Sequence, residues 1–160
     1  MDGDALYRNE SAAIRRYLSR MLGDRDAAED LVQETFVRAL RHPSALERSG
    51  RSWLFTVATN LLRDRVRKTD RHARLATSVP EPVASRTDAG AERRELRERL
   101  DAALGALSHR ERSAVLLRQE GYAQREIAEI LGTTTGTIGT LTVRALRKLA
   151  DSEQLRPFRP

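Results

Sequence analysis

The sequence contains no cysteine among its 160 residues. Without thiols the chain can form no disulfide, no zinc-thiolate site and no cysteine nucleophile. Its three histidines, His42, His72 and His109, lie far apart, and none has the spacing of a metal-binding pair. We therefore predict that the protein has no metal site and uses no cofactor.

Long hydrophobic runs are also absent. The opening stretch, MDGDALYRNE, is acidic and leads into no apolar segment of the kind found in signal peptides. Nowhere do the roughly 20 apolar residues of a membrane-spanning helix follow one another. We expect a cytoplasmic protein that does not insert into a membrane.

Signatures of catalysis are lacking as well. The Gly/Thr-rich stretch near residue 135 has no lysine of the kind that completes a phosphate-binding loop, and no nucleophile motif occurs. The carboxylates fall on predicted solvated helix faces rather than in a cluster. We predict that the protein is not an enzyme.

Charge, by contrast, is abundant and unequal in sign. The chain has 29 Lys and Arg against 23 Asp and Glu, a net charge of +6. Such an excess favours a polyanionic partner, because side chains that neutralise phosphates release counterions. Solubility alone is the alternative explanation.

Hydrophobic periodicity divides the chain into two helical segments. Apolar residues recur at helical spacing over residues 5–68, whereas the region from about 69 to 91 is rich in Pro, Ser, Ala and Thr and has no period. No stretch alternates long enough to predict a strand. We predict an all-α fold with a first module over residues 1–69, a flexible linker over 70–91, a second module over 92–152 and a tail over 153–160.

Three helices are expected in the first module. The first ends at Gly23, which suits a left-handed cap, and Asp24 can cap the second. The sequence HPSALERSG breaks the pattern at Pro43, so we expect a loop over residues 42–50. The third helix starts near Arg51 and ends in the basic run RDRVRK.

Aromatic residues are scarce, at 4% of the chain, yet Trp53 and Phe55 precede that basic run. Rings stack on unpaired bases while guanidinium groups hold the backbone, so this combination suits single-stranded nucleic acid. Packing of both rings in a core, with a solvated basic end, is the alternative.

The second module predicts a helix-turn-helix. Ser108 and Glu111 form a capping box that opens one helix, which Gly121 ends. A short helix, AQREIAEILG, stops at Gly132, and Thr134 can cap the next one. In such an arrangement the helix after the turn enters the major groove of a duplex.

The helix that follows this turn is unusual, because residues 131–143 carry no charge. A helical wheel turns Ile138, Thr142, Ala145 and Leu149 inward with Leu141 on the flank, and turns Gly136, Thr140, Arg144 and Arg147 outward with Thr137 and Val143 beside them. Each helical glycine costs roughly 1 kcal/mol relative to alanine. Close approach of the backbone to a partner or to another helix would explain the glycines, and so would plain tolerance of a weak helix.

Three motifs together resemble bacterial sigma factors of the extracytoplasmic-function (ECF) group. They are DAAEDLVQETFVRAL, RSWLFTVATNLLRDRVRK and LSHRERSAVLLRQEGYAQREIAEILG, in this order with a linker before the last. The resemblance covers about residues 6–68 and 96–149. It implies a sigma region-two helical bundle followed by a region-four helix-turn-helix.

The resemblance further implies a subunit that binds core RNA polymerase, directs it to promoters and helps to open the duplex. Its implied partners are the clamp of the largest polymerase subunit, the flap of the second-largest subunit, promoter DNA and an anti-sigma factor. The motif DLVQETF carries the polymerase contact onto Asp30, Gln33 and Glu34, an acidic patch opposite the apolar stripe of its helix.

The promoter contacts follow from the same resemblance. The loop before Trp53 would capture a flipped base, and the helix after it would assist melting. The residues assigned to the downstream element are Arg48, Arg51, Trp53, Arg63, Arg65, Arg67 and Lys68. Those assigned to the upstream element are Thr134, Thr137, Thr140, Arg144 and Arg147.

The second module departs from the family pattern. Members commonly carry a Lys-Ser-Arg-like trio where this chain has Gly139, Thr140 and Leu141, and Thr142 replaces a larger apolar residue. Upstream binding would then be weak, would read another sequence through shape and backbone, or would depend on another protein.

Two other classes remain open. A conventional helix-turn-helix regulator would bind promoter DNA without polymerase, although the acidic patch and the aromatic-basic helix count against it. An RNA- or single-strand-binding protein is the other, and helix-turn-helix geometry suits a duplex better.

Overall fold

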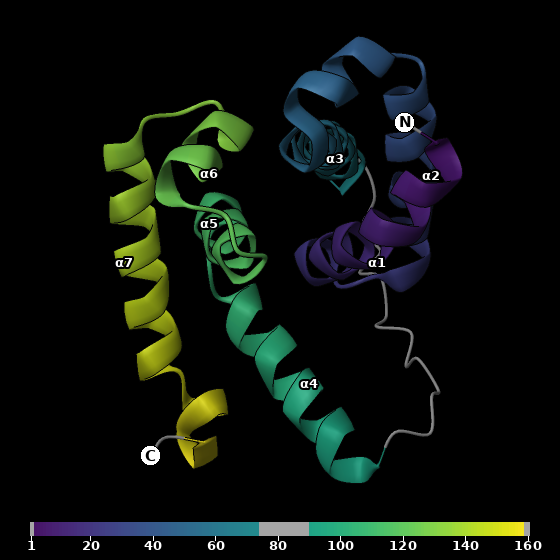
Figure 1. The fold of residues 1–160 in the computed structure, drawn as a ribbon. Coiled ribbons are helices and arrows are strands. Elements are labelled where there is room, and N and C mark those ends of the chain that lie inside the picture. Colours follow the sequence, from purple (N-terminus) through teal and green to yellow (C-terminus); the bar gives the residue numbers. More distant parts are fainter. Residues whose placement is uncertain (1, 74–89, 159–160) are drawn as a thin grey trace. The chain divides into compact units, whose positions relative to one another are not determined.

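The computed structural model describes residues 2–73 and 90–158 of the chain. Every regular element in these ranges is helical, so the predicted all-α fold is confirmed. The chain divides into two compact units, one built on α1–α3 and the other on α4, α5, α7 and the start of α6 (Figure 1). Residues 74–89, most of the predicted linker, lie outside the described ranges.

Both predicted caps at the first turn of the chain are confirmed. Helix α1 (Gly3–Leu22) ends at Gly23, whose φ of 66° is left-handed and whose N–H donates to the carbonyl of Ser19 at 2.8 Å. Helix α2 (Arg25–Leu40) begins where the Asp24 carboxylate accepts from the N–H groups of Asp26 and Ala27. Each cap satisfies backbone groups that a helix end leaves open.

Helix α3 (Pro43–Ala73) corrects one prediction, because it begins inside the segment expected to be a loop. Proline is well suited to a first helical position, since its φ is already helical and its missing N–H has no partner to lose there. Leu46, only 5% exposed, anchors this short segment to the core. The irregular backbone is confined to Gly50, with φ 48° and ψ −124°, where two helices meet in a kink.

The first unit closes around its own core, in which α2 packs on both α1 and α3. Ile14, Leu18, Leu54 and Leu62 are fully buried there. The Tyr17 hydroxyl lies 3.1 Å from Thr59 Oγ1, which satisfies two polar groups inside the core.

The second unit contains α4 (Ala91–Gly105), α5 (His109–Gln119), the start of α6 (Gln124–Leu131), α7 (Thr135–Asp151) and the 3-10 helix η1 (Glu153–Phe158). The predicted capping box at α5 is present: Glu111 N donates to Ser108 Oγ at 3.2 Å, and Ser108 N donates to Glu111 Oε2 at 3.0 Å. Gly121 and Gly132 take the left-handed φ values of 94° and 64° that end α5 and α6. Most of the predicted tail forms η1, which packs against α4 and α7.

One carboxylate joins α5 to α7. Glu111, whose side chain is 6% exposed, accepts from Lys148 Nζ at 2.8 Å while it also completes the capping box. The hydrogen bond from Lys148 and then that from the Ser108 backbone hold the pKa of Glu111 below its ordinary value. The C-terminal half of α7 is thereby fixed to the beginning of α5.

Candidate polymerase and nucleic-acid interfaces

The acidic face of α2 is accessible, as the sequence predicts. Asp30 and Gln33 are exposed, and the stripe opposite them is buried in the core of the first unit. Glu34 is half-buried and pairs with Arg38, whose Nε lies 2.7 Å from Glu34 Oε1. Two of the three predicted contact residues therefore point to solvent, and the third already has a cationic neighbour.

An ion pair fixes this face against α1. Arg15 Nε donates to Glu29 Oε2 at 2.6 Å, and this hydrogen bond holds the pKa of Glu29 below its ordinary value. Arg15 Nη2 also donates to the Tyr7 hydroxyl at 3.4 Å. Because Glu29 directly precedes Asp30, the pair lies beside the predicted docking face.

On α3 the predicted downstream residues fall into three groups. Arg48, Arg63, Arg67 and Lys68 are exposed, whereas Trp53 and Arg65 are half-buried. Arg51 is engaged within the unit, since its Nε lies 2.9 Å from Glu10 Oε2 and its guanidinium lies 5.4 Å from the Phe55 ring centroid.

Of the two aromatic residues, only Trp53 is accessible. Phe55 is fully buried, and its ring lies 5.5 Å from that of Tyr17, so the interpretation of an aromatic pair that receives bases is wrong for Phe55. Trp53 packs edge-on against His42, with ring centroids 6.1 Å apart. The ring is thus held from one side, beside the kink at Gly50.

The outward and inward faces of α7 are those that the helical wheel predicts. Ile138, Thr142 and Ala145 are buried, and Leu149 and Leu141 are half-buried. The outward residues Gly136, Thr140, Val143, Arg144 and Arg147 are exposed, and Thr137 is half-buried. Thr134 caps the helix by accepting from Thr137 N at 3.2 Å.

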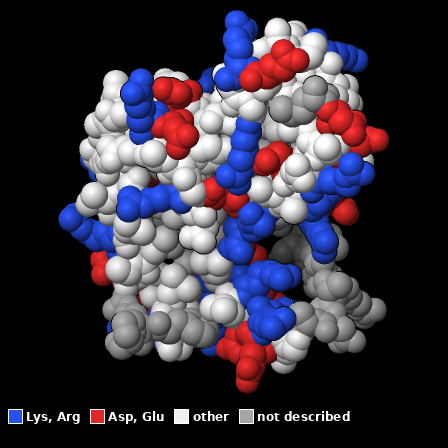
Figure 2. Space-filling model, viewed as in Figure 1, with Lys and Arg blue, Asp and Glu red and all other residues white. Residues whose placement is uncertain are grey.

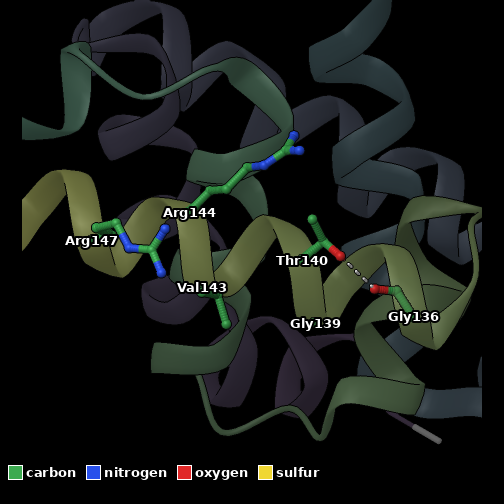
Figure 3. A pocket seen from close by; sticks show the side chains of 6 residues that line it. All are labelled: Gly136, Gly139, Thr140, Val143, Arg144 and Arg147. Atoms are coloured by element: carbon green, nitrogen blue, oxygen red, sulfur yellow. Dashed lines mark hydrogen bonds between the residues drawn. The ribbon is translucent and has the colours of Figure 1, made fainter.

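A shallow hollow of about 490 Å³ lies on this outward face. We call it the α7 hollow; it is lined by Gly136, Gly139, Thr140, Val143, Arg144 and Arg147. Figure 3 shows these residues along the helix, with the two arginine side chains extending from its C-terminal half.

The two glycines of the hollow have different surroundings. The sequence offers two explanations for them, a close approach of the backbone to a partner or another helix and tolerance of a weak helix, and the surroundings differ in which one they support. A Cβ on Gly139 would lie 3.0 Å from Gln124 Nε2, and this same amide donates to the Thr135 carbonyl at 2.5 Å. Gly139 therefore permits a close contact between α6 and α7. A Cβ on Gly136 would meet nothing nearer than Thr134 Oγ1 at 4.0 Å, so no packing requires this glycine.

Four residues outside the predicted site residues lie at these surfaces. Asn60 is exposed and lies seven residues from Trp53 and from Arg67, so the three share one side of α3, a periodicity that the sequence contains. Val37 and Leu40 extend the exposed stripe of α2 beyond Gln33. Nothing in the local sequence indicates that Gln124 reaches across to α7.

Charge on the surface is mixed. Figure 2 shows both Lys and Arg side chains and Asp and Glu side chains on the visible face. Within residues 2–73 and 90–158, no group of three His, Asp or Glu side chains is placed to hold a metal ion. No helix of the described ranges is long and apolar enough to cross a membrane.

The geometry defines a class of protein: an all-helical chain that combines an exposed acidic face on α2, a basic tryptophan-bearing helix α3 and a helix-turn-helix formed by α6 and α7. Comparison with known proteins gives the family. The family described as Sigma-70 region 2 matches residues 6–72, and the family described as Sigma-70, region 4 matches residues 97–149. The chain belongs to the sigma-70 family and, within it, to the ECF sigma factors.

Two relatives illustrate the membership. The ECF RNA polymerase sigma factor SigL of Mycobacterium tuberculosis is 38% identical over an alignment 160 positions long. The alignment covers 89% of this chain and 85% of SigL. The RNA polymerase sigma factor CarQ of Myxococcus xanthus is 31% identical over 153 residues, covering 91% of this chain and 86% of CarQ.

Solved structures agree with this assignment. The sigma factor RpoE, in complex with the anti-sigma factor NepR from Bartonella quintana, matches with a TM-score of 0.79 and 26% identity over 96% of each chain. CnrH, in complex with the cytosolic domain of CnrY, matches with a TM-score of 0.68 and 27% identity over 94% of this chain and 89% of CnrH. A sigma factor binds RNA polymerase and selects promoters, and the conventional regulator is not favoured.

Proposed function

We propose that the first unit docks on the clamp of the largest polymerase subunit through α2, with Asp30 and Gln33 at the centre of the contact. The observation that carries this proposal is the exposure of both side chains on a face whose opposite side is buried. Glu34 contributes after its ion pair with Arg38 rearranges or is shared. A carboxylate surface on a chain of net charge +6 is also well suited to select a basic partner over DNA.

The test reverses charge at the docking face. The double variant Asp30→Lys, Glu34→Lys should lose most of its affinity for core polymerase, because truncated or inverted charges at a docking surface leave the partner's groups unpaired. Binding is measured without DNA, by fluorescence anisotropy of the labelled protein. The matched control is Asp70→Lys, an exposed acid on α3 of the same unit. Unchanged binding by the double variant, with helicity retained in circular dichroism, removes this assignment.

We propose that the side of α3 that bears Trp53 assists promoter opening. Its half-buried ring, held by His42, offers a face for an extruded base of the downstream element. Arg48, Arg63, Arg67 and Lys68 are placed to hold the backbone, and Arg65 contributes from a half-buried position. Of the residues assigned to the downstream element, Arg51 is the least well supported as a DNA contact, because Glu10 and Phe55 already engage its guanidinium.

The substitution Trp53→Ala should reduce promoter opening several-fold while leaving polymerase docking within about twofold, since base–aromatic stacking is worth roughly 1–3 kcal/mol per base. Opening is followed by permanganate reactivity of thymines in the melted strand. The variant Trp53→Phe keeps a ring and should recover part of the effect. Equal loss of docking and opening, or loss of helicity, would show that Trp53 acts only in the core.

The second unit completes the proposed activity. We assign residues 92–152 to the upstream promoter element and to the flap of the second-largest subunit, with α7 entering the major groove and Thr134 capping its first turn. Residues 1–69 carry docking and melting. The protein acts without catalysis of its own, and in the cytoplasm, where polymerase and its DNA template are found.

An anti-sigma factor is the remaining proposed partner. One of the solved relatives described above, the sigma factor RpoE, was captured in complex with the anti-sigma factor NepR. Transcription with core polymerase from a pooled promoter library tests the whole proposal. Selective, protein-dependent transcripts are expected, whereas specific duplex binding without any binding to core polymerase would indicate a conventional regulator instead.

A further inference from the structure

Hydroxyl groups on the outward side of α7 are already engaged within the helix. Thr134 Oγ1 accepts from Thr137 N at 3.2 Å and lies 2.9 Å from Thr137 Oγ1. Thr140 Oγ1 donates to the Gly136 carbonyl at 3.2 Å. The Thr140 hydroxyl proton is therefore not available to a base edge.

Apart from the acceptor oxygen of Thr140 and the two arginines, the surface of the α7 hollow is apolar. Figure 3 shows the Thr140 hydroxyl directed toward Gly136, with its methyl group on the other branch of the side chain. Val143, one turn further along, is 54% exposed. With Gly136 and Gly139, these two side chains give the α7 hollow a lining of methyl groups and bare backbone, and Arg144 and Arg147 supply its cations.

The chemistry of the major groove indicates what such a lining can recognise. Guanine is read by the fork of Arg or by Lys, and adenine by Asn or Gln. Residues 132–143, which include the N-terminal turns of α7 that contact base edges in a helix-turn-helix, contain none of these four residue types, and Arg144 and Arg147 follow only in the C-terminal half of the helix. Thymine alone presents a methyl group in the groove, and apolar side chains and threonine methyls contact it.

We infer that α7 reads its upstream promoter element chiefly through thymine methyl groups, which seat in the α7 hollow against Thr140 and Val143 while Arg144 and Arg147 hold phosphates. This inference rests on the proposed role of the second unit in upstream binding. The absence of a side chain at Gly136 lets the backbone approach the bases, which offsets the short reach of threonine and valine. Each methyl group removed from water should strengthen binding about three- to fourfold.

The experiment uses the complete holoenzyme on a promoter chosen from the library described above. Every thymine of the upstream segment is replaced in turn by deoxyuridine, which removes the methyl group and leaves base pairing unchanged. At each sensitive position a second duplex carries 5-methylcytosine paired with guanine, and a third carries cytosine. Wild-type binding should fall three- to fourfold with deoxyuridine, and 5-methylcytosine should bind better than cytosine.

Two protein variants remove methyl groups from the other side of the contact. Thr140→Ser keeps the hydroxyl and its bond to Gly136, and Val143→Thr keeps the volume of the side chain. Each should weaken binding to the thymine duplex by a similar factor and lose its sensitivity to deoxyuridine. The control is Leu146→Ala, a 48% exposed apolar residue on the same helix outside the hollow, which should retain that sensitivity.

The outcomes separate the inference from the function on which it rests. Promoter-selective transcription that is indifferent to every deoxyuridine substitution overturns the inference and leaves the sigma activity intact. Failure of the wild-type protein to direct core polymerase to any promoter overturns the proposed function instead. If a variant fails to fold, the deoxyuridine series on the wild-type protein decides the matter alone.

Discussion

At the scale of single residues, the two glycines of the α7 hollow should respond differently to the same change. Gly136→Ala should raise the free energy of unfolding by up to about 1 kcal/mol, because alanine is the better helix former and the added Cβ would meet nothing nearer than Thr134 Oγ1 at 4.0 Å. Gly139→Ala should gain less or lose stability, since its Cβ would press on Gln124 at 3.0 Å. Urea unfolding of both variants measures the difference, and equal gains would contradict it.

A second prediction at this scale concerns Glu111. Because its pKa is lower in the folded than in the unfolded chain, the stabilisation it gives is complete above its ordinary value of 4.5 and is lost as the pH falls through the folded-state value. Glu111→Gln keeps an acceptor for the capping box but removes the charge that pairs with Lys148. The variant should melt below the wild type at pH 7.

The same comparison repeated at lower pH supplies the check. The gap in melting temperature between wild type and Glu111→Gln should narrow as the pH drops below about 4.5. Glu98→Gln, at an exposed carboxylate on α4 that lies 3.9 Å from Arg94, is the control and should melt near the wild type throughout. A gap that is independent of pH would show that packing, rather than charge, makes Glu111 important.

At the scale of elements, the kink of α3 depends on one backbone conformation. Gly50 has a φ of 48°, a value that other residues adopt only with strain. Gly50→Ala should therefore cost about 1–2 kcal/mol in the free energy of unfolding. Gly105→Ala, at a helical glycine with nothing within 4 Å of the added Cβ, is the matched control and should be neutral or stabilising.

Promoter opening gives this prediction a second measurement. Trp53 follows the kink by less than one helical turn, so a shifted backbone at residue 50 should move its ring away from His42. Gly50→Ala is thus expected to slow opening more than docking to core polymerase. A variant that is destabilised but opens promoters at the wild-type rate would show that the kink does not position Trp53.

An element can be predicted from the sequence when the residues that define its ends lie within the element or next to it. The ends of α1, α2 and α5 follow from local chemistry, namely Gly23, Asp24 and the Ser108–Glu111 box, and these predictions are confirmed. The local sequence predicts a loop for the first turns of α3, because a proline and polar neighbours surround the one residue that is buried there, Leu46. Such a contact depends on tertiary packing, which local propensity does not contain.

The candidate sites follow the same division. The faces of α7 could be predicted, because burial repeats with the period of the helix. Burial of Phe55 and engagement of Arg51 by Glu10 could not, because both depend on how α1 meets α3. Contacts between residues far apart in the sequence are the part of the site that local sequence patterns do not predict.

At the scale of the whole molecule, a net charge of +6 with mixed surface charge predicts local rather than global attraction to DNA. Each phosphate contact adds about 0.9 to the slope of log affinity against log salt concentration. Arg144→Ala combined with Arg147→Ala should therefore reduce the slope for holoenzyme binding to the promoter by about two. Arg97→Ala, at an exposed site on α4, should leave the slope unchanged.

The bare face of α7 has a practical consequence for synthetic gene circuits. A Cβ at Gly136 would make only an ordinary contact with Thr134, and Thr140 and Val143 are exposed, so these three positions can be randomised without disturbing the core. A library of such variants, selected against a matching library of upstream elements, should yield mutually orthogonal regulators on one scaffold. In a helix that already carries a basic trio, the existing DNA contacts must be removed before new ones are introduced. In this helix, new base-contacting side chains can be added without that step.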